Sequence, residues 1–117
     1  MAIQTRFLFR ASMDVDPVKE ALFNDVYDVE HVPLLSRVSG VISVARFKTQ
    51  ELTMVLGGER RTIVAEGEPR YTALYELESP DVLTSEAWAK VVDAGRWPGE
   101  VRPFTKNRRH VLWQRLG

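Results

Sequence analysis

The sequence predicts an α+β domain in which two strand–helix–strand units contribute to one antiparallel sheet. Alternating apolar residues, the pattern of a half-buried strand, occur in four stretches: residues 3–11, 41–50, 70–77 and 108–116. Apolar residues at three- and four-residue spacing, the pattern of an amphipathic helix, occur in two: residues 17–33 and 80–94. No repeat, low-complexity segment or linker interrupts the 117 residues, so residues 1–117 are predicted to form a single domain.

The first strand and the first helix have the clearest patterns. One face of the strand carries Ile3, Thr5, Phe7 and Phe9. Asp16 is a good N-cap and Pro17 a good first helical residue, so the helix is expected to begin there. It is expected to end near Pro33, because the residue before a proline avoids the helical conformation.

The second half of the chain repeats this order after an irregular insert. In residues 50–69, "TMVL" and "RTIVAE" flank Gly57-Gly58, which allows a short hairpin extension of the sheet and leaves a loop equally open. Ser79 or Asp81 then caps the second helix. The next stretch, "DAGRWPGEVRP", is expected to be a loop, because it contains two glycines and two prolines.

This order of elements predicts a ferredoxin-like βαββαβ fold with both helices on one face of the sheet. The other face is not polar, because Leu74 in the third strand and Val111 and Trp113 in the last strand fall on it. A sheet with apolar residues on both faces should be covered on both faces. No third long helix is available, so a second copy of the chain is predicted to cover it, and the protein is expected to be a homodimer.

Composition excludes several classes of function. Lysine plus arginine and aspartate plus glutamate both number 16, so the net charge is zero and favours neither nucleic acid nor an anionic membrane as a partner. There is no cysteine, which excludes disulfides and thiolate catalysis. We find neither the apolar core of a signal peptide nor a run of about 20 apolar residues. The sequence therefore predicts a cytoplasmic protein.

One of only two histidines, His31, is the main candidate for chemistry. Tyr27 and Asp28 lie four and three residues before it, so on a helix both can be its neighbours. The aspartate could fix the tautomer of the imidazole, and the tyrosine could donate a hydrogen bond to a substrate oxygen. A second interpretation stays open, in which a histidine in the last turn only interacts with the helix dipole. His110, in the last strand, is interpreted as a surface residue, and the two histidines lack metal-ligand spacing.

The stretch "LFNDVYDVEHVPLL", followed by "SGVISVARF", resembles a known pattern. The pattern is carried by Phe23, Tyr27, His31 and Pro33: an aromatic residue, a histidine four positions later in His-x-Pro, and a glycine that opens a strand. It is similar to that of the EthD-type proteins of the dimeric α/β-barrel superfamily. The third strand "YTALYEL" and the helix "ESPDVLTSEAWAKV" also look like elements of that family, and the resemblance covers most of residues 3–93.

The resemblance implies a homodimer in which two sheets face each other as an α/β barrel. It also implies a pocket between each sheet and its helices, with the position of His31 facing that pocket. The superfamily includes cyclases, isomerases, cofactor-free monooxygenases and haem-degrading enzymes, so the fold does not fix the reaction.

Together these observations predict an enzyme that acts on a small, hydrophobic aromatic or polyketide-like molecule without metal or cofactor, as a cyclase, isomerase or lyase. His31 is the expected acid or base, Tyr27 the donor and Asp28 the residue that orients the imidazole. The pocket is expected to be lined by aromatic residues: Phe23, Tyr71, Tyr75, Trp88 and Trp97. Two alternatives are a non-catalytic small-molecule binding protein of a catabolic or biosynthetic pathway and a cofactor-free monooxygenase.

Overall fold

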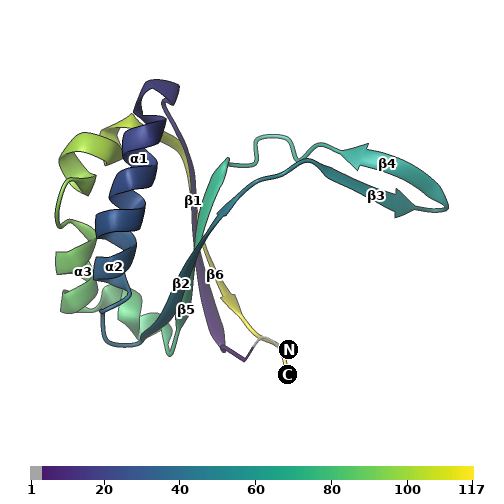
Figure 1. Cartoon of the computed structure of the whole chain (residues 1–117). Helices are drawn as coiled ribbons and strands as arrows, with labels where there is room; N and C mark the ends of the chain where they lie inside the picture. The colour runs from purple at the N-terminus through teal and green to yellow at the C-terminus, as the bar shows by residue number, and fades with distance from the viewer. Residues whose placement is uncertain (1–3) are drawn as a thin grey trace.

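The computed structural model describes residues 4–117 and contains a four-stranded antiparallel sheet with helices on one face (Figure 1). The strands lie in the spatial order β2–β5–β1–β6, the order expected for two interlocked strand–helix–strand units. Their bounds are Phe7–Val15 for β1, Val41–Lys48 for β2, Tyr71–Leu77 for β5 and Thr105–Gln114 for β6. The ferredoxin-like α+β fold is thus confirmed, although β1 continues to Val15 where the alternation predicted an end at residue 11.

The first helical segment begins as predicted and ends later than predicted. The Asp16 side chain accepts a hydrogen bond from the backbone N–H of Val18 at 3.0 Å, before a first 3₁₀ turn at Pro17–Lys19. The segment continues through α1 (Glu20–Val26), a π-helical turn and α2, and does not stop at Pro33.

A π-helical turn explains how the helix passes Pro33. The turn spans Tyr27–His31, and the N–H of Val32 donates to the carbonyl of Tyr27, five residues earlier. α2 (Val32–Leu35) then carries the proline in its first turn. A proline ring inside a regular helix clashes with the carbonyl four residues before it, and a widened turn relieves that clash. The predicted helix end at Pro33 was therefore wrong.

The second helical region is divided, where a single helix was predicted. Ser79 caps a 3₁₀ segment, Pro80–Thr84, and Ser85 caps α3, Glu86–Val92, by accepting from the N–H of Trp88 at 3.2 Å. Ser85 has an extended backbone, so it cannot continue the first segment while capping the second. The predicted loop that follows is also helical: a π turn at Trp97–Val101 and a 3₁₀ turn at Arg102–Phe104, each with a proline in its first turn.

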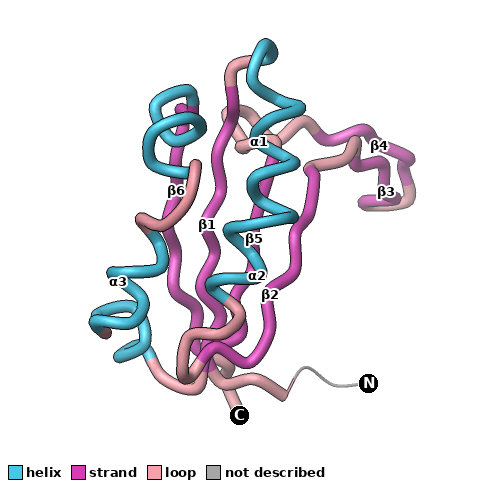
Figure 2. Tube along the Cα trace, turned by 60° about the vertical axis from the view of Figure 1, so that its left-hand side comes forward, coloured by secondary structure: helices cyan, strands magenta, loops and turns pink. Residues whose placement is uncertain are grey.

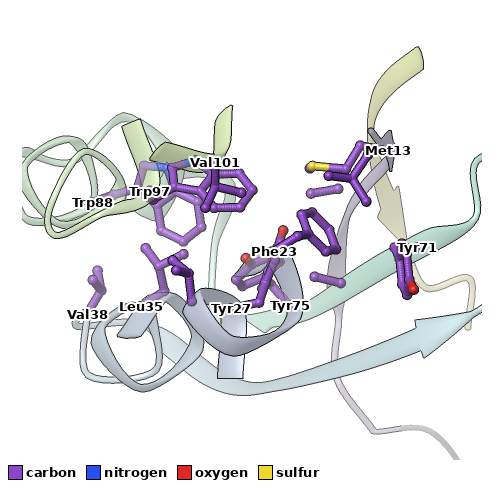
Figure 3. Close-up of a cluster of buried hydrophobic side chains, with 14 of the residues drawn as sticks. Met13, Phe23, Tyr27, Leu35, Val38, Tyr71, Tyr75, Trp88, Trp97 and Val101 are labelled. Atoms are coloured by element: carbon purple, nitrogen blue, oxygen red, sulfur yellow. The ribbon is translucent and has the colours of Figure 1, made fainter. Parts of the chain in front are cut away.

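The core lies between the sheet and this helical layer. α1, α2 and α3 cover the same face of the sheet (Figure 2). Alternate residues of β1 and β5 point into the core, and Leu35 and Tyr27 of the first helical segment meet Trp97 and Val101 of the second region (Figure 3). The aromatic side chains fix the spacing between the layers.

The opposite face of the sheet carries no helix, and its composition is mixed. Its apolar residues, by register, are Leu8, Ala45, Phe47, Leu74, Val111 and Trp113. Polar side chains lie among them, and Arg10, near the centre, forms an ion pair with Glu68. The predicted apolar positions on this bare face are therefore present, but about half of the face is polar.

The insert forms a hairpin that pairs with no other strand. β3 (Leu52–Leu56) and β4 (Glu59–Ile63) are joined by Gly57 and Gly58, which both have positive φ, as a two-residue hairpin turn requires. They form a separate two-stranded sheet that projects from the side of the main sheet opposite the helices (Figure 1). The hairpin is thus confirmed, but it does not extend the main sheet. None of the helices within residues 4–117 is both long and apolar enough to cross a membrane.

Candidate functional site

A cavity of about 170 Å³ lies between the sheet and the helical layer. The sheet supplies one wall, with Phe9, Ala11, Met13, Tyr75, Arg108 and His110. The helical layer supplies the other, with Tyr27, His31, Leu35, Trp88, Val92, Trp97 and Arg102. Aromatic and aliphatic groups make up most of the lining, and all of its charged side chains are arginines.

The π turn carries both Tyr27 and His31 toward this cavity. The His31 residue is only 5% exposed, and its ring stacks on that of Trp97 with centroids 4.5 Å apart and planes at 23°. The Tyr27 ring meets it edge-on at 5.1 Å. Within residues 4–117 no hydrogen bond reaches the His31 ring nitrogens, although no fully buried side-chain nitrogen or oxygen there lacks a partner. The ring nitrogens are therefore accessible from the cavity.

The surroundings of His31 keep its imidazole neutral. Burial and then the positive charge of Arg102, partly opposed by Asp93, together lower the pKa of His31 to about 4. Arg102 forms an ion pair with Asp93 and donates to the carbonyl of Val92 at 3.4 Å. At pH 7 the imidazole can donate or accept a hydrogen bond or bind a metal, but its pKa is poorly matched to proton transfer.

The two tyrosines at the cavity remain protonated. Burial raises the pKa of Tyr27 to about 12, against the opposing effects of Arg46 and of a hydrogen bond with Tyr75. Burial also raises the pKa of Tyr75 well above its ordinary value. Both hydroxyls therefore act as hydrogen-bonding groups rather than as acids or bases near pH 7.

Asp28 lies away from the imidazole that it was predicted to orient. Its carboxylate binds Arg46 of β2 at 2.7 Å, and the side chain is largely exposed. Arg46 also donates to Asn24 at 2.8 Å and lies 4.5 Å from the ring centroid of Tyr27. The prediction for Asp28 failed because the arginine of the sheet attracts the carboxylate. The acidic residue that acts on His31 is Asp93.

The predicted aromatic lining divides into two groups. Tyr75, Trp88 and Trp97 line the cavity. Phe23 and Tyr71 lie behind Tyr27, with ring centroids 5.0 Å from each other, and do not line it. They pack around the Arg46 guanidinium instead.

Three basic residues of the cavity were not predicted as site residues. His110 stacks on Phe9 at 5.9 Å with planes at 10°, and burial, then the charge of Arg108, lower the pKa of His110. Arg108 has neither an ion pair nor a hydrogen bond from its side chain within residues 4–117. Alternation grouped His110 with Arg108 and Leu112, but it could not show that this face meets the helices. No sequence signal pointed to Arg102.

The described residues 4–117 contain no cluster of three or more histidine and carboxylate side chains that could hold a metal ion.

Comparison with known proteins places the fold but not the activity. No family model matches the sequence, and no curated protein matches it. Among solved structures, the chain is similar to the haem degrader MhuD from Mycobacterium tuberculosis, solved with two haems bound in its active site. The match covers 94% of this chain and 95% of that chain, at 14% sequence identity and a TM-score of 0.55.

The two chains share a fold. At that sequence identity the likeness establishes the ferredoxin-like α+β architecture and leaves both the superfamily and the activity open. The resemblance to EthD-type proteins is a finer statement, and it stays a prediction.

Proposed function

We propose that the cavity binds a small, planar aromatic molecule with an anionic group or a phenolic hydroxyl. The observation that carries this proposal is the guanidinium of Arg108, which forms no ion pair within residues 4–117 and lies beside His110 on a cavity lined mostly by aromatic and aliphatic groups. The rings suit a flat apolar ligand. An arginine without a carboxylate partner suits an anionic oxygen on that ligand.

The size of the cavity limits the ligand. About 170 Å³ is close to the roughly 150 Å³ of a protein cavity that holds benzene, and below the 300–1,000 Å³ typical of pockets for drug-sized molecules. The ligand class is therefore a substituted single ring.

The protonation states favour one of the predicted reaction classes. A cyclase or isomerase must take up a proton and return it near pH 7, and neither neutral His31 nor protonated Tyr27 is matched to that task. Oxygenation of a phenol to a quinone removes two protons from the substrate, the hydroxyl proton and one ring C–H proton, and both end in the water that is formed. His110 is the candidate base and Arg108 the group that stabilises the phenolate. A ring carbon of the phenolate bonds dioxygen, and the proton held by His110 returns to give a hydroperoxide. The O–O bond then breaks as hydroxide and the ring C–H proton leave together as water, and the quinone remains. We favour a cofactor-free monooxygenase over the predicted cyclase, isomerase or lyase, because those predictions assign the proton transfer to His31.

Haem is the second candidate ligand, favoured by the likeness to a haem degrader and by the neutral His31 imidazole. Two arginines at the cavity could also bind the carboxylates of haem. A tetrapyrrole does not fit a cavity of about 170 Å³, however, so this candidate requires the helical layer to move.

Ligand titration tests the binding proposal. Benzoate and benzyl alcohol have the same ring and differ in charge, and Trp88 and Trp97 report binding by fluorescence and calorimetry. Benzoate should bind more tightly, and Arg108→Gln should weaken it about tenfold while leaving benzyl alcohol unchanged. The exposed Arg37→Gln is the matched control. Equal affinity for both probes, or no effect of Arg108→Gln, would contradict the proposal.

An oxygen electrode and a haemin titration then separate the two candidate functions. Oxygen consumption with phenols, abolished by His110→Gln, supports the monooxygenase. A Soret band that shifts on haemin addition and is lost in His31→Ala supports haem binding. Binding of benzoate with neither signal would leave a non-catalytic binding protein.

A further inference from the structure

The homodimer on the bare side of the sheet is already predicted from the sequence, and we propose that the hairpin β3–β4 is an arm that packs on the second copy in that dimer. This inference does not depend on the ligand of the cavity. It rests on the apolar face of the hairpin, on the contacts that hold its base, and on the surface area of the chain.

The hairpin has one apolar face with nothing packed on it. By the register of the two strands, Leu52, Met54, Leu56 and Ile63 share this face, and each is 36–47% exposed. The remaining two side chains of this face, Glu59 and Arg61, form an ion pair with each other at 2.8 Å. The apolar strip is therefore not interrupted by an unpaired charge.

The other face of the hairpin is more polar. Thr53 and Thr62 form a hydrogen bond across the strands at 3.0 Å, with Arg60 on the same side. Val55 is the exposed apolar residue there. A two-stranded hairpin alone is only marginally stable in water. An amphipathic hairpin that pairs with no third strand therefore needs a surface for its apolar face.

Polar contacts from two strands, β1 and β6, hold the base of the arm. Glu68 pairs with Arg10 of β1 and lies 3.9 Å from Arg109 of β6. The carbonyl of Gly67 accepts from Asn107 and Arg109, both at 2.9 Å. These contacts hold the base of the arm on the bare side of the sheet, so the arm is not a loose insertion folded back on its own chain (Figure 1).

We define the base clasp as the side chains of Arg10, Asp14, Glu68, Asn107 and Arg109. The backbone of Arg70 is bound to it. The Arg70 N–H donates to Asp14 of β1 at 2.8 Å, and Asn107 donates to the same carboxylate at 3.1 Å. Both ends of the insert are therefore tied to the main sheet, since Thr49 also donates to the Arg70 carbonyl at 2.8 Å.

The surface area indicates what the arm packs on. The chain exposes 7777 Å², whereas a folded monomer of 13.4 kDa is expected to expose about 6,500 Å². Its radius of gyration is 16.0 Å, against about 13.4 Å for a compact domain of this length. The excess of about 1,300 Å² lies within the roughly 1,000–2,500 Å² that each chain buries in an obligate dimer.

A second copy fits this surface better than an unrelated partner. The apolar residues of the bare sheet face, among them Phe47 and Trp113, lie on the same side as the arm. A two-fold axis through that side brings the face and the arm of each chain to the other chain, so both surfaces are buried by one symmetric contact. The net charge of zero gives two copies no overall repulsion.

Sedimentation equilibrium tests the proposal. The full chain should be a dimer at micromolar concentration. Leu52→Lys combined with Leu56→Lys should raise the dimer dissociation constant at least about 100-fold, while Val55→Lys on the opposite face should change it less than about threefold. Circular dichroism confirms that each variant is folded. A monomeric full chain, or a dimer unaffected by the paired lysines, would overturn the proposal.

A spin label gives a second readout that does not require the two lysine substitutions. The chain has no cysteine, so Met54→Cys and Val55→Cys each provide one labelling site. A nitroxide at position 54 should be immobilised and one at 55 mobile. Equal mobility at both positions would also overturn the proposal, because it would leave the apolar face in water.

Discussion

At position 31 an imidazole is packed between the rings of Trp97 and Tyr27, with its nitrogens accessible from the cavity. The spacing of Tyr27 and His31 was enough to predict that they share a helix face. The partner of the imidazole was not predictable in this way, because Asp93 and Arg102 come from the other helical region. Asp28 satisfied the spacing rule, but its carboxylate forms an ion pair with Arg46 of β2 at 2.7 Å.

The lowered pKa of His31 makes stability depend on pH. The folded pKa of about 4 lies below the ordinary 6.5, so the unfolded chain binds the proton first as the pH falls. Stability is therefore fully present above pH 6.5 and is lost toward pH 4. Between pH 6.5 and 5 the loss should be about 2 kcal/mol in urea titrations. His31→Gln should remove most of this dependence of stability on pH. His110→Gln should remove a smaller part of it, because His110 is more exposed than His31. A variant slope equal to that of the original chain would mean that His31 is not the group responsible.

Substitution of Asp28 tests the corrected role of that residue. Asp28→Asn removes only a largely exposed ion pair with Arg46, so the free energy of unfolding should fall by less than about 1 kcal/mol. Benzoate affinity should stay within about twofold, because the carboxylate does not line the cavity. A tenfold loss of affinity, measured by calorimetry, would restore Asp28 to the site.

At the scale of elements, the strands were easier to predict than the helices. The alternation in β1, β2 and β5 follows directly from one-sided burial. Helix ends depend on whether a residue continues one helix or caps the next. Ser85 has an extended backbone and caps α3, and the preceding segment therefore ends there. The turn at Trp97–Val101 was expected to be a loop from its prolines and glycines, but a proline in a first helical turn loses no hydrogen bond.

The turn into β2 depends on one glycine, as its sequence suggested. Gly40 has a φ of +92°, and a Cβ there would lie 2.4 Å from a methyl group of Val82. Gly40→Ala should therefore destabilise the protein by about 2–3 kcal/mol, through backbone strain and a clash in the core. Gly99→Ala is the matched control, because its φ is ordinary and a Cβ there would meet no atom within 4 Å of the described structure. Equal unfolding midpoints for the two variants would contradict this account.

At the scale of the whole molecule, the order of elements was sufficient to predict the four-stranded sheet and the helices on one face. The position of the insert was not predictable, because Gly57-Gly58 fixes a hairpin but says nothing of where it points. Its direction is set by the base clasp, in which one hydrogen bond joins Asn107 to Asp14, 93 residues apart in sequence. The cavity was not predictable for the same reason, because it is lined by residues of β6 and of the first helical segment, which are far apart in sequence.

An arm-exchanged dimer predicts that thermal stability depends on protein concentration. When two chains unfold together, a tenfold rise in concentration stabilises the dimer by about 1.4 kcal/mol. The melting temperature should then rise by about 3–5 °C per decade in scanning calorimetry. The Leu52→Lys and Leu56→Lys double variant should lose this dependence. A melting temperature that is constant from 5 to 500 µM, on the order of two decades, would argue for an independent monomer.

Strand β1 has two sets of side chains that belong to different surfaces. Its residues alternate between the faces of the sheet, so Phe9, Ala11 and Met13 wall the cavity while Arg10 and Asp14 hold the base clasp. A one-residue slip of this strand would exchange the two sets. A ligand that displaced β1 would therefore also displace the residues that hold the base of the arm. In the dimer proposed above, the cavity of one chain would then be coupled through β1 and the arm to the neighbouring chain.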